Sequence, residues 1–537
     1  MVVIEGVVRV CGWLVRGAVG GAVAALLAGC VTSPGPGDSN ADAPGPIPED
    51  CEVDSDLGKR DLRGSWITTV RNIDWPSEPG LSAQQQQQEL RDQLDTLDHM
   101  DFNTAFLHVR PTADAVYSSD KEPWARYLTG EQGGDPGYDP LKFAVEEAHK
   151  RGLELHAWFN PYRAGLKEPD LENLVEDHPL EQHPEWLVEY ADEGYFDPGD
   201  PEVQQWVSDV VLDVVERYDV DGAHFDDFFY PYPDGDAHFD DDRTWEEYGD
   251  DFDSRAAWRR DNVNTLLEDV HTRIGETKPW VQFGVSPFGI WRNDTTDPSG
   301  SATSGLQSYD DQHADTRAWI DQGLVDYVLP QLYWQRGNEA ADYEELVDWW
   351  SEQVSDSDVN LYIGQAAYMH GEEEDWTGED SLSRQLDFNE EYSEVAGNVY
   401  FSQKDLTGRA GDAMDRVAED HYRAPALPPE VSGGGDGPGR VTEVNAEHTG
   451  DSVELGWEPA EDARFYAVYR VPGEDGARPC DLADATHLLD IVGPDGDGAV
   501  SFTDAEPADE PVEYVVTALD NHRTEGAPSP AAPVEQG

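Results

Sequence analysis

The residues best suited to chemistry in this chain are two adjacent carboxylates, Asp226 and Asp227, in the segment VDGAHFDDFFYP at residues 220–231. The segment begins as an apolar run with polar residues at every second position, which predicts a buried strand. It then breaks into the two acids, three aromatics and a proline. Acids are costly to bury without partners, so this pair needs either a structural partner or a chemical role. At the carboxyl end of a barrel strand we expect the chemical role.

Adjacent residues on a regular strand face opposite sides, so only one of the two acids can point inward. Asp226 has the inward parity and is the predicted principal acid. Asp227 acts beside it if the strand kinks there, or else orients it and raises its pKa by like-charge repulsion. A carboxyl that stays protonated near neutral pH is what general-acid cleavage of a glycosidic bond requires. The structural alternative is an acid pair bound to an arginine such as Arg110 or Arg163.

Polar and aromatic side chains share one parity near the ends of several predicted strands. A core without a function would carry Val, Ile or Leu at such positions. Aromatic planes stack on the apolar faces of sugar rings, and amides and carboxylates bond the hydroxyls. The pattern therefore predicts a sugar-binding cleft, with inner-layer histidines and core aromatics as the alternative. The residues concerned are His108 and Arg110, His156, Trp158 and Asn160, His224 and Asp226, and Gln331 and Tyr333.

Composition and motifs argue against several other functions. The chain has 35 Lys and Arg against 113 Asp and Glu, a formal net charge of −78, which repels nucleic acid and excludes it as a partner. No His-x-His or Cys cluster has the spacing of a zinc site, and no Gly-x-Ser-x-Gly elbow indicates a serine esterase. The sequence therefore predicts neither a metal nor a cofactor.

Strand and helix patterns alternate along residues 59–423 and would position these side chains. We expect eight strands, beginning near residues 62, 102, 153, 220, 281, 325, 361 and 397. Helical patterns at 82–100, 140–151, 202–218, 254–276, 314–322, 343–354, 382–395 and 409–422 separate them. Successive strand-helix units predict an α/β fold of the (β/α)₈ TIM-barrel type. A doubly wound sheet is the alternative, but its Gly-rich phosphate loop is missing after the first strand.

The N-terminal residues have the features of an export signal. Arg9 and Arg16 precede an apolar segment that is too short to span a membrane, and it ends in Leu-Ala-Gly-Cys at residues 27–30. This ending resembles the bacterial lipobox. The resemblance implies cleavage before Cys30, acylation of that thiol with a lipid such as palmitate, and anchoring to the cell membrane on the side that faces the cell wall. A plain secretory signal is the alternative.

Residues 31–58 are rich in Pro, Gly, Ser and Asp and predict a flexible linker. Residues 424–439 form a second linker. From residue 440 to 537, strand-like runs separated by turn residues predict a small all-β sandwich, and the spacing of Trp457, Tyr469 and Tyr514 resembles a fibronectin type III module. In an exported chain Cys51 and Cys480 could form a disulfide between the first linker and this module.

Long motifs in order along residues 61–422 resemble the glycosyl-hydrolase-like 10 family. They include NTAFLHVRP at residue 103, YDPLKFAVEEAHKRGLELHAWFNPYR at 138, VDGAHFDDFFYP, FGVSPFGIWRN at 283 and VDYVLPQLYW at 325. The resemblance implies a barrel glycosidase whose site is the cleft at the strand ends. Bacterial members of the family include an outer-membrane lipoprotein that cleaves peptidoglycan glycan strands stripped of their peptides.

The second catalytic group is left open by the sequence. Double-carboxylate glycosidases hold an Asp or Glu across the cleft, but the sixth and seventh strands end around Gln331 and Gln365. The partner is Asp227, or a loop acid such as Asp74, Asp114 or Asp294, or the N-acetyl group of the substrate itself.

The sequence thus predicts a lipid-anchored glycoside hydrolase that acts on N-acetylhexosamine-containing cell-wall glycan. The rival interpretation is a carbohydrate-binding lipoprotein without catalysis. Asp226 and Asp227 are the predicted catalytic residues. The predicted sugar-binding residues are Arg110, His156, Trp158, Asn160, Tyr230, Trp291, Gln331, Tyr333 and Trp334.

Overall fold

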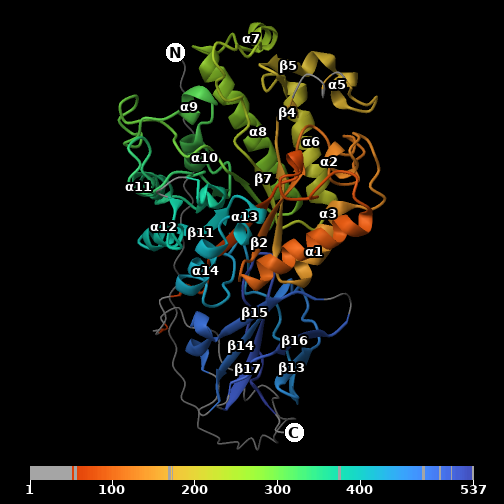
Figure 1. Ribbon diagram of the computed structural model, residues 1–537, viewed down its shortest axis with the longest axis vertical. Coiled ribbons are helices and arrows are strands. Elements are labelled where there is room, and N and C mark those ends of the chain that lie inside the picture. Colours follow the sequence, from red (N-terminus) through yellow and green to blue (C-terminus); the bar gives the residue numbers. More distant parts are fainter. Residues whose placement is uncertain are drawn as a thin grey trace, which may run out of the picture. The chain divides into compact units, whose positions relative to one another are not determined.

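The computed structural model describes residues 51, 53, 57–166, 171, 173–372, 376–473, 478–494, 498–508 and 511–534 (Figure 1). The predicted signal segment and Cys30 lie outside these residues. Within the described part of the chain, no helix combines the length and the apolar character needed to cross a membrane.

Eight parallel strands form a closed barrel, which confirms the predicted barrel and excludes the open sheet. Every neighbour is hydrogen-bonded in parallel, and the last strand pairs with the first through Leu62 opposite Gly397. In order around the barrel the strands are β1 (Leu62–Ile67), β11 (Val395–Tyr400), β10 (Asn360–Gln365), β9 (Tyr327–Val328), β8 (Gln282–Val285), β7 (Gly222–Phe225), β3 (Glu154–Phe159) and β2 (Thr104–Arg110).

A helix follows each barrel strand at the predicted place. Side chains of Ser82, Asp139, Asp200, Ser254 and Asp342 accept hydrogen bonds from backbone N–H groups in the first turn, which fixes where these helices begin. The helices are α1 (Ala83–His99), α3 (Pro140–Lys150), α6 (Pro201–Arg217), α8 (Arg255–Thr277), α10 (Thr316–Gln322), α11 (Tyr343–Val354), α12 (Ser383–Asn389) and α14 (Gly411–Asp420).

The helix α12 ends six residues before the predicted end, because the chain turns at Glu390 and enters β11 at Val395. Shorter helices occupy the loops. They are α2 (Arg126–Thr129), α5 (Pro179–Gln182), α7 (Asp242–Tyr248), α9 (Ser308–Asp311) and α13 (Gln403–Thr407), with 3₁₀ turns η1 (Val70–Asn72), η2 (Pro184–Trp186) and η3 (Ala367–Met369).

An insertion between β3 and α6 carries a small antiparallel sheet that the sequence patterns do not predict. Its strands are β4 (Arg163–Gly165), β6 (Glu193–Phe196) and β5 (Leu187–Tyr190), in that order across the sheet. Arg163 pairs with Tyr195 in the register of β4 and β6. This sheet begins only a few residues after the carboxyl end of β3, so it can supply side chains to the mouth of the barrel.

The C-terminal region consists of two antiparallel sheets with a shared apolar core, as predicted for an all-β unit. Trp457 and Val453 from one sheet and Tyr466 and Val516 from the other belong to the same buried cluster. One sheet contains β12 (Val444–Thr449), β13 (Ser452–Trp457) and β16 (Val500–Asp504). The other contains β15 (Leu488–Val492), β14 (Phe465–Pro472), β17 (Val512–Leu519) and β18 (Ala532–Pro533), and the turns η5 (Pro479–Leu482) and η6 (Ala485–His487) lie between β14 and β15.

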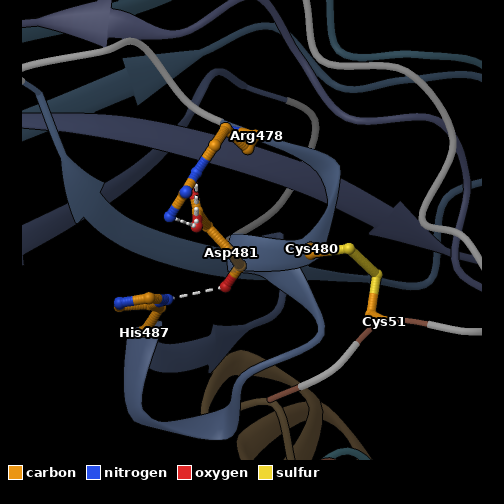
Figure 2. Close-up of a disulfide and its surroundings, with 5 residues drawn as sticks. All are labelled: Cys51, Arg478, Cys480, Asp481 and His487. Carbon is orange, nitrogen blue, oxygen red and sulfur yellow. Dashed lines mark hydrogen bonds and ion pairs between the residues drawn. A yellow bond between two sulfur atoms is a disulfide. The ribbon is translucent and has the colours of Figure 1, made fainter. Parts of the chain in front are cut away.

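Buried polar contacts and a disulfide join this region to the rest of the chain. The Arg523 guanidinium donates through Nη2 to Glu154 Oε2 at 2.7 Å, and both residues are buried. Cys51 and Cys480 form a disulfide with a Cα–Cα distance of 5.3 Å (Figure 2). The pairing that the sequence left open is therefore present in the structure.

Candidate active site

A cavity of about 390 Å³ opens at the carboxyl ends of the barrel strands. Each of the eight strands contributes a side chain at its end or shortly after it. These residues are Trp66, His108, Trp158, Asp226, Asp227, Ser286, Gln331, Tyr333, Tyr368 and Phe401. The cavity thus combines aromatic planes with carboxylates and amides, which is the composition of a sugar site.

Both acids line this cavity, because β7 ends at Phe225 and the chain leaves the strand before reaching them. The parity rule that separated Asp226 from Asp227 therefore no longer applies. Each residue is 4% exposed. In the described part of the chain neither forms an ion pair, so the structural alternative of an acid pair held by arginine is not what the structure shows.

Asp226 is held by three donors. Its Oδ2 accepts from Trp158 Nε1 and from Asn160 Nδ2, both at 3.1 Å, and its Oδ1 accepts from the Phe228 backbone N–H at 3.2 Å. Burial raises the pKa of Asp226 to about 7, with a smaller increase from the Asp227 charge and a decrease from Arg163. A carboxyl with this pKa is protonated in part at neutral pH and can donate a proton.

Asp227 is held differently. Its Oδ2 accepts a hydrogen bond from the Tyr232 hydroxyl and another from Gln312 Nε2 at 3.3 Å. Burial raises its pKa, and these two hydrogen bonds act in the opposite direction. The two neighbouring carboxyls therefore have separate sets of donors, which can support separate roles.

Arg110 and His156 do not reach the cavity, which corrects their predicted role as direct sugar ligands. Arg110 is fully buried and donates through Nε to Glu122 Oε2 at 2.8 Å. His156 is fully buried with Nδ1 3.0 Å from the Tyr327 hydroxyl, in a layer of the barrel interior that also contains Phe106. His156 is thus the inner-layer histidine of the alternative interpretation.

Four further predicted ligands also lie outside the cavity lining. Asn160 lies behind the cavity wall and donates a hydrogen bond to the Asp226 carboxylate. Tyr230 is buried and accepts from Asn262 Nδ2 at 3.1 Å. Trp291 stacks on Trp349 with ring centroids 5.9 Å apart, and Trp334 packs edge-on against Phe288. The predicted residues that do line the cavity are Asp226, Asp227, Trp158, Gln331 and Tyr333.

The loop acids proposed as partners are also placed away from the cavity. Asp74 accepts from Ser402 Oγ at 2.7 Å and from the Thr68 backbone N–H at 2.8 Å. Asp114 Oδ1 accepts from the Thr112 hydroxyl at 3.1 Å. These two acids stabilise loops, and Asp294 is exposed and does not line the cavity.

Sequence reasoning missed two kinds of cavity residue. Trp66 and Phe401 come from the first and eighth strands, where the rule of aromatics near strand ends would have found them. Arg163 and Glu193 come from the small inserted sheet, whose short strands have no periodic signal. Glu193 is a carboxylate in the cavity wall, and its Oε2 accepts from Tyr195 at 2.8 Å.

His108 was singled out by parity and does line the cavity. Its ring stacks on Trp158 with centroids 3.8 Å apart and planes inclined by 9°. Within the described residues neither ring nitrogen has a hydrogen-bond partner, and burial holds its pKa well below the usual value. His108 is thus a neutral ring that supports Trp158 from behind or bonds a ligand.

A second hollow of about 420 Å³ adjoins the first. The two share Arg71, Leu166, Glu193 and Phe228 in their walls. Tyr190, Tyr195 and Tyr232 line the second hollow and extend the aromatic surface beyond the acids. The two hollows therefore adjoin through these four shared residues.

Comparison with known proteins matches residues 61–377, more than half of the chain, to the family described as glycosyl hydrolase-like 10. The chain belongs to this family. Among its relatives, glycosyl hydrolase YngK of Bacillus subtilis (strain 168) is 43% identical over 426 residues, which cover 77% of this chain and 84% of YngK. Glycosyl hydrolase DigH of Escherichia coli (strain K12) is 42% identical over 364 residues, 64% of this chain and 83% of DigH.

A solved structure is also similar, with a much lower sequence identity. The glycoside hydrolase domain of PgaB (BpsB) from Bordetella bronchiseptica is 11% identical, with a TM-score of 0.44, over 66% of this chain and 98% of that domain. The assignment of the chain to the glycosyl hydrolase-like 10 family depends on the sequence relatives and not on this likeness.

Proposed function

We propose that this chain is a glycoside hydrolase that cleaves N-acetylhexosamine-containing cell-wall glycan, most specifically peptidoglycan strands, by carboxylate general-acid catalysis. The observation that carries the proposal is Asp226, a carboxyl whose pKa is raised to about 7 inside a cavity lined by aromatic side chains. A binding protein without catalysis has no need of an acid poised in this way.

In the proposed reaction Asp226 gives its proton to the glycosidic oxygen as the bond from that oxygen to the anomeric carbon breaks. The leaving sugar departs as an alcohol, and positive charge develops on the ring that remains. Water supplies the hydroxyl of the new reducing end, and Asp226, now ionised, takes up the proton that the water loses. The net reaction consumes one water for each bond cut.

Asp227 is the proposed partner that stabilises or orients the group attacking the anomeric carbon. That group is either a carboxylate of the enzyme or the N-acetyl oxygen of the substrate, as in substrate-assisted families. The hydrogen bonds from Tyr232 and Gln312 hold the Asp227 carboxyl in place and partly offset the rise in its pKa that burial causes. Glu193 is the further candidate from the cavity wall.

The location of the protein is part of the same proposal. Export with a lipid on Cys30 would hold the enzyme at the membrane and next to the wall polymer. The disulfide between Cys51 and Cys480 is in keeping with an oxidising compartment. The three-stranded and four-stranded C-terminal sheets suit the fibronectin type III-like module expected from the sequence, which would act as a spacer or a binding unit.

The experiment is digestion of defined peptide-free glycan strands with the full-length protein, with the products weighed by mass spectrometry and the anomeric protons followed by NMR. We expect new reducing ends. The mass of each fragment should equal the sum of its sugar residues plus one water. Retention of configuration would support the substrate-assisted route, and inversion would exclude it. Binding of the strands with no fragment formed would favour the non-catalytic alternative.

A further inference from the structure

Arg163 is a buried cation in the wall of the cavity. The residue is 7% exposed and lines the cavity together with Asp226. Its guanidinium carbon lies over the Phe228 ring, 4.4 Å from the ring centroid, which is a cation–π contact. In the described part of the chain the guanidinium makes no hydrogen bond or ion pair, and Nε is buried without an acceptor.

Two other deeply buried arginines of this chain each form an ion pair with a buried glutamate. Arg110 donates through Nη2 to Glu122 at 2.5 Å, and Arg523 donates through Nη2 to Glu154 at 2.7 Å. A charge taken out of water normally needs such a partner, because removing its hydration is costly. The donors of Arg163 are therefore available for a ligand.

Asp226 does not take the place of that ligand. Arg163 is near enough to lower the pKa of Asp226, but the two groups form no ion pair. The Asp226 carboxyl already accepts from Trp158 and Asn160. Arg163 in turn is tied to the same network through its backbone N–H, which donates to Asn160 Oδ1 at 2.9 Å. The arginine is thus held near Asp226 without forming an ion pair with it.

We propose that Arg163 binds a free carboxylate carried by a sugar ring of the substrate. The inference rests on the proposed function and specifies its substrate class. A guanidinium presents parallel N–H donors that match the two oxygens of a carboxylate, and within the described residues the buried Nε of Arg163 has no acceptor. On a chain of formal net charge −78 the general field repels anions, so an anionic substrate needs a local cation of this kind.

The carboxylate has a chemical source in the proposed polymer. Every second hexosamine of peptidoglycan carries an ether-linked lactyl group, which ends in a carboxylate when no peptide is attached and in a neutral amide when one is. Arg163 would therefore select strands without peptides by charge. A bound carboxylate would also neutralise the cation that acts against protonation of Asp226, so the correct substrate would favour the acidic form of Asp226.

The test compares two forms of the same strands in the full-length protein. Peptide-free strands with free lactyl carboxylates are assayed beside strands whose carboxylates have been converted to methylamides. For the unmodified enzyme we expect kcat/KM to favour the free acid by about 10- to 100-fold, as a charge-assisted bidentate contact implies. In Arg163→Gln the ratio should fall to within about threefold of one, and Arg163→Lys, which keeps the charge but not the fork, should lie between.

Arg384→Gln is the matched control, because it removes one arginine from the exposed surface of α12. It should keep the full ratio of the unmodified enzyme. An unmodified enzyme without preference, or an Arg163→Gln enzyme with an unchanged ratio, would overturn the inference. Failure to cleave either form would instead count against the proposed function.

Binding to Asp226→Asn gives a second readout that needs neither turnover nor a folded Arg163 variant. By calorimetry the free-acid strands should bind at least about tenfold more tightly than the methylamide strands, and equal affinities would contradict the inference. Oligomers of a uronic acid place the carboxylate directly on the ring. Preference for these over lactyl strands would support carboxylate recognition but contradict peptidoglycan as the source.

Discussion

The indole Nε1 of Trp158 lies 3.1 Å from Oδ2 of Asp226, so one aromatic wall of the cavity also holds the acid. The same indole stacks on His108 behind it. The hydrogen bond favours the ionised form of Asp226, whereas burial favours the protonated form, and burial has the larger effect on the pKa. Trp158 thus links the surface on which a sugar can stack to the protonation of Asp226.

Replacing Trp158 by Phe should move the pH dependence of activity. The pKa of Asp226 is about 7, so kcat/KM of the unmodified enzyme should fall above that pH as the acid loses its proton. Trp158→Phe keeps a ring but removes the donor, so the descending limb should shift to higher pH. The measurement is kcat/KM between pH 5 and 9, and a limb at the same pH in both proteins would show that this hydrogen bond does not tune the acid.

The free energy of unfolding should depend on pH through the same Asp226 carboxyl. The pKa of Asp226 rises from 3.8 to about 7 on folding, so between these values the folded state holds a proton that the unfolded state has lost. The free energy of unfolding must then fall as pH rises through this window, by at most about 4 kcal/mol from this group. Asp226→Asn cannot titrate and should gain stability relative to the unmodified protein from pH 4 to 7.5.

Urea denaturation at several pH values would measure that difference. The ordinary offset between Asp and Asn cancels, because only the change with pH is used. Parallel stability curves for the two proteins would mean that Asp226 ionises normally in the folded state.

The buried pair of Arg523 and Glu154 predicts strong coupling between the C-terminal sheets and the barrel. Arg523→Met leaves Glu154 charged and buried without its partner, and should destabilise the protein by about 3–5 kcal/mol. Adding Glu154→Met should restore most of the loss, because two apolar groups carry no desolvation cost of this kind. The double-mutant cycle by chemical denaturation measures the coupling, and additive single effects would contradict it.

Removal of the disulfide should destabilise the protein as well. Cys51 and Cys480 are 429 residues apart in sequence, so the bridge closes a long loop in the unfolded chain. We expect Cys480→Ser to lose about 2–5 kcal/mol of stability. Peptide mapping without reductant should give a single linked peptide that contains both cysteines, and recovery of two free thiols from the exported protein would contradict the pairing.

The barrel could be predicted from the sequence because its alternating strand and helix patterns are regular. The alternation of side chains along each strand, however, predicted some residues to line the site that lie deeper in the barrel. His156 and Trp158 share one parity, but two residues along a strand differ by about 6–7 Å in depth. Parity therefore selects the inward face without separating the interior layer, where His156 lies, from the mouth, where Trp158 lies.

Other site residues had no signal of this kind. Arg163 and Glu193 come together only because the inserted sheet pairs β4 with β6 across a loop. Strands of three or four residues are too short for periodicity to identify them. The position of Asp227 depended on the residue at which β7 ends, which is the least predictable property of a strand.

The most direct measurement is the release of reducing ends from peptide-free peptidoglycan strands by the full-length protein and by Asp226→Asn. We expect the substitution to lower the rate by about 10²- to 10⁴-fold, the usual contribution of a general acid, while pull-down of the glycan is retained. Cleavage by Asp226→Asn at the rate of the unmodified protein would show that Asp226 is not the proton donor.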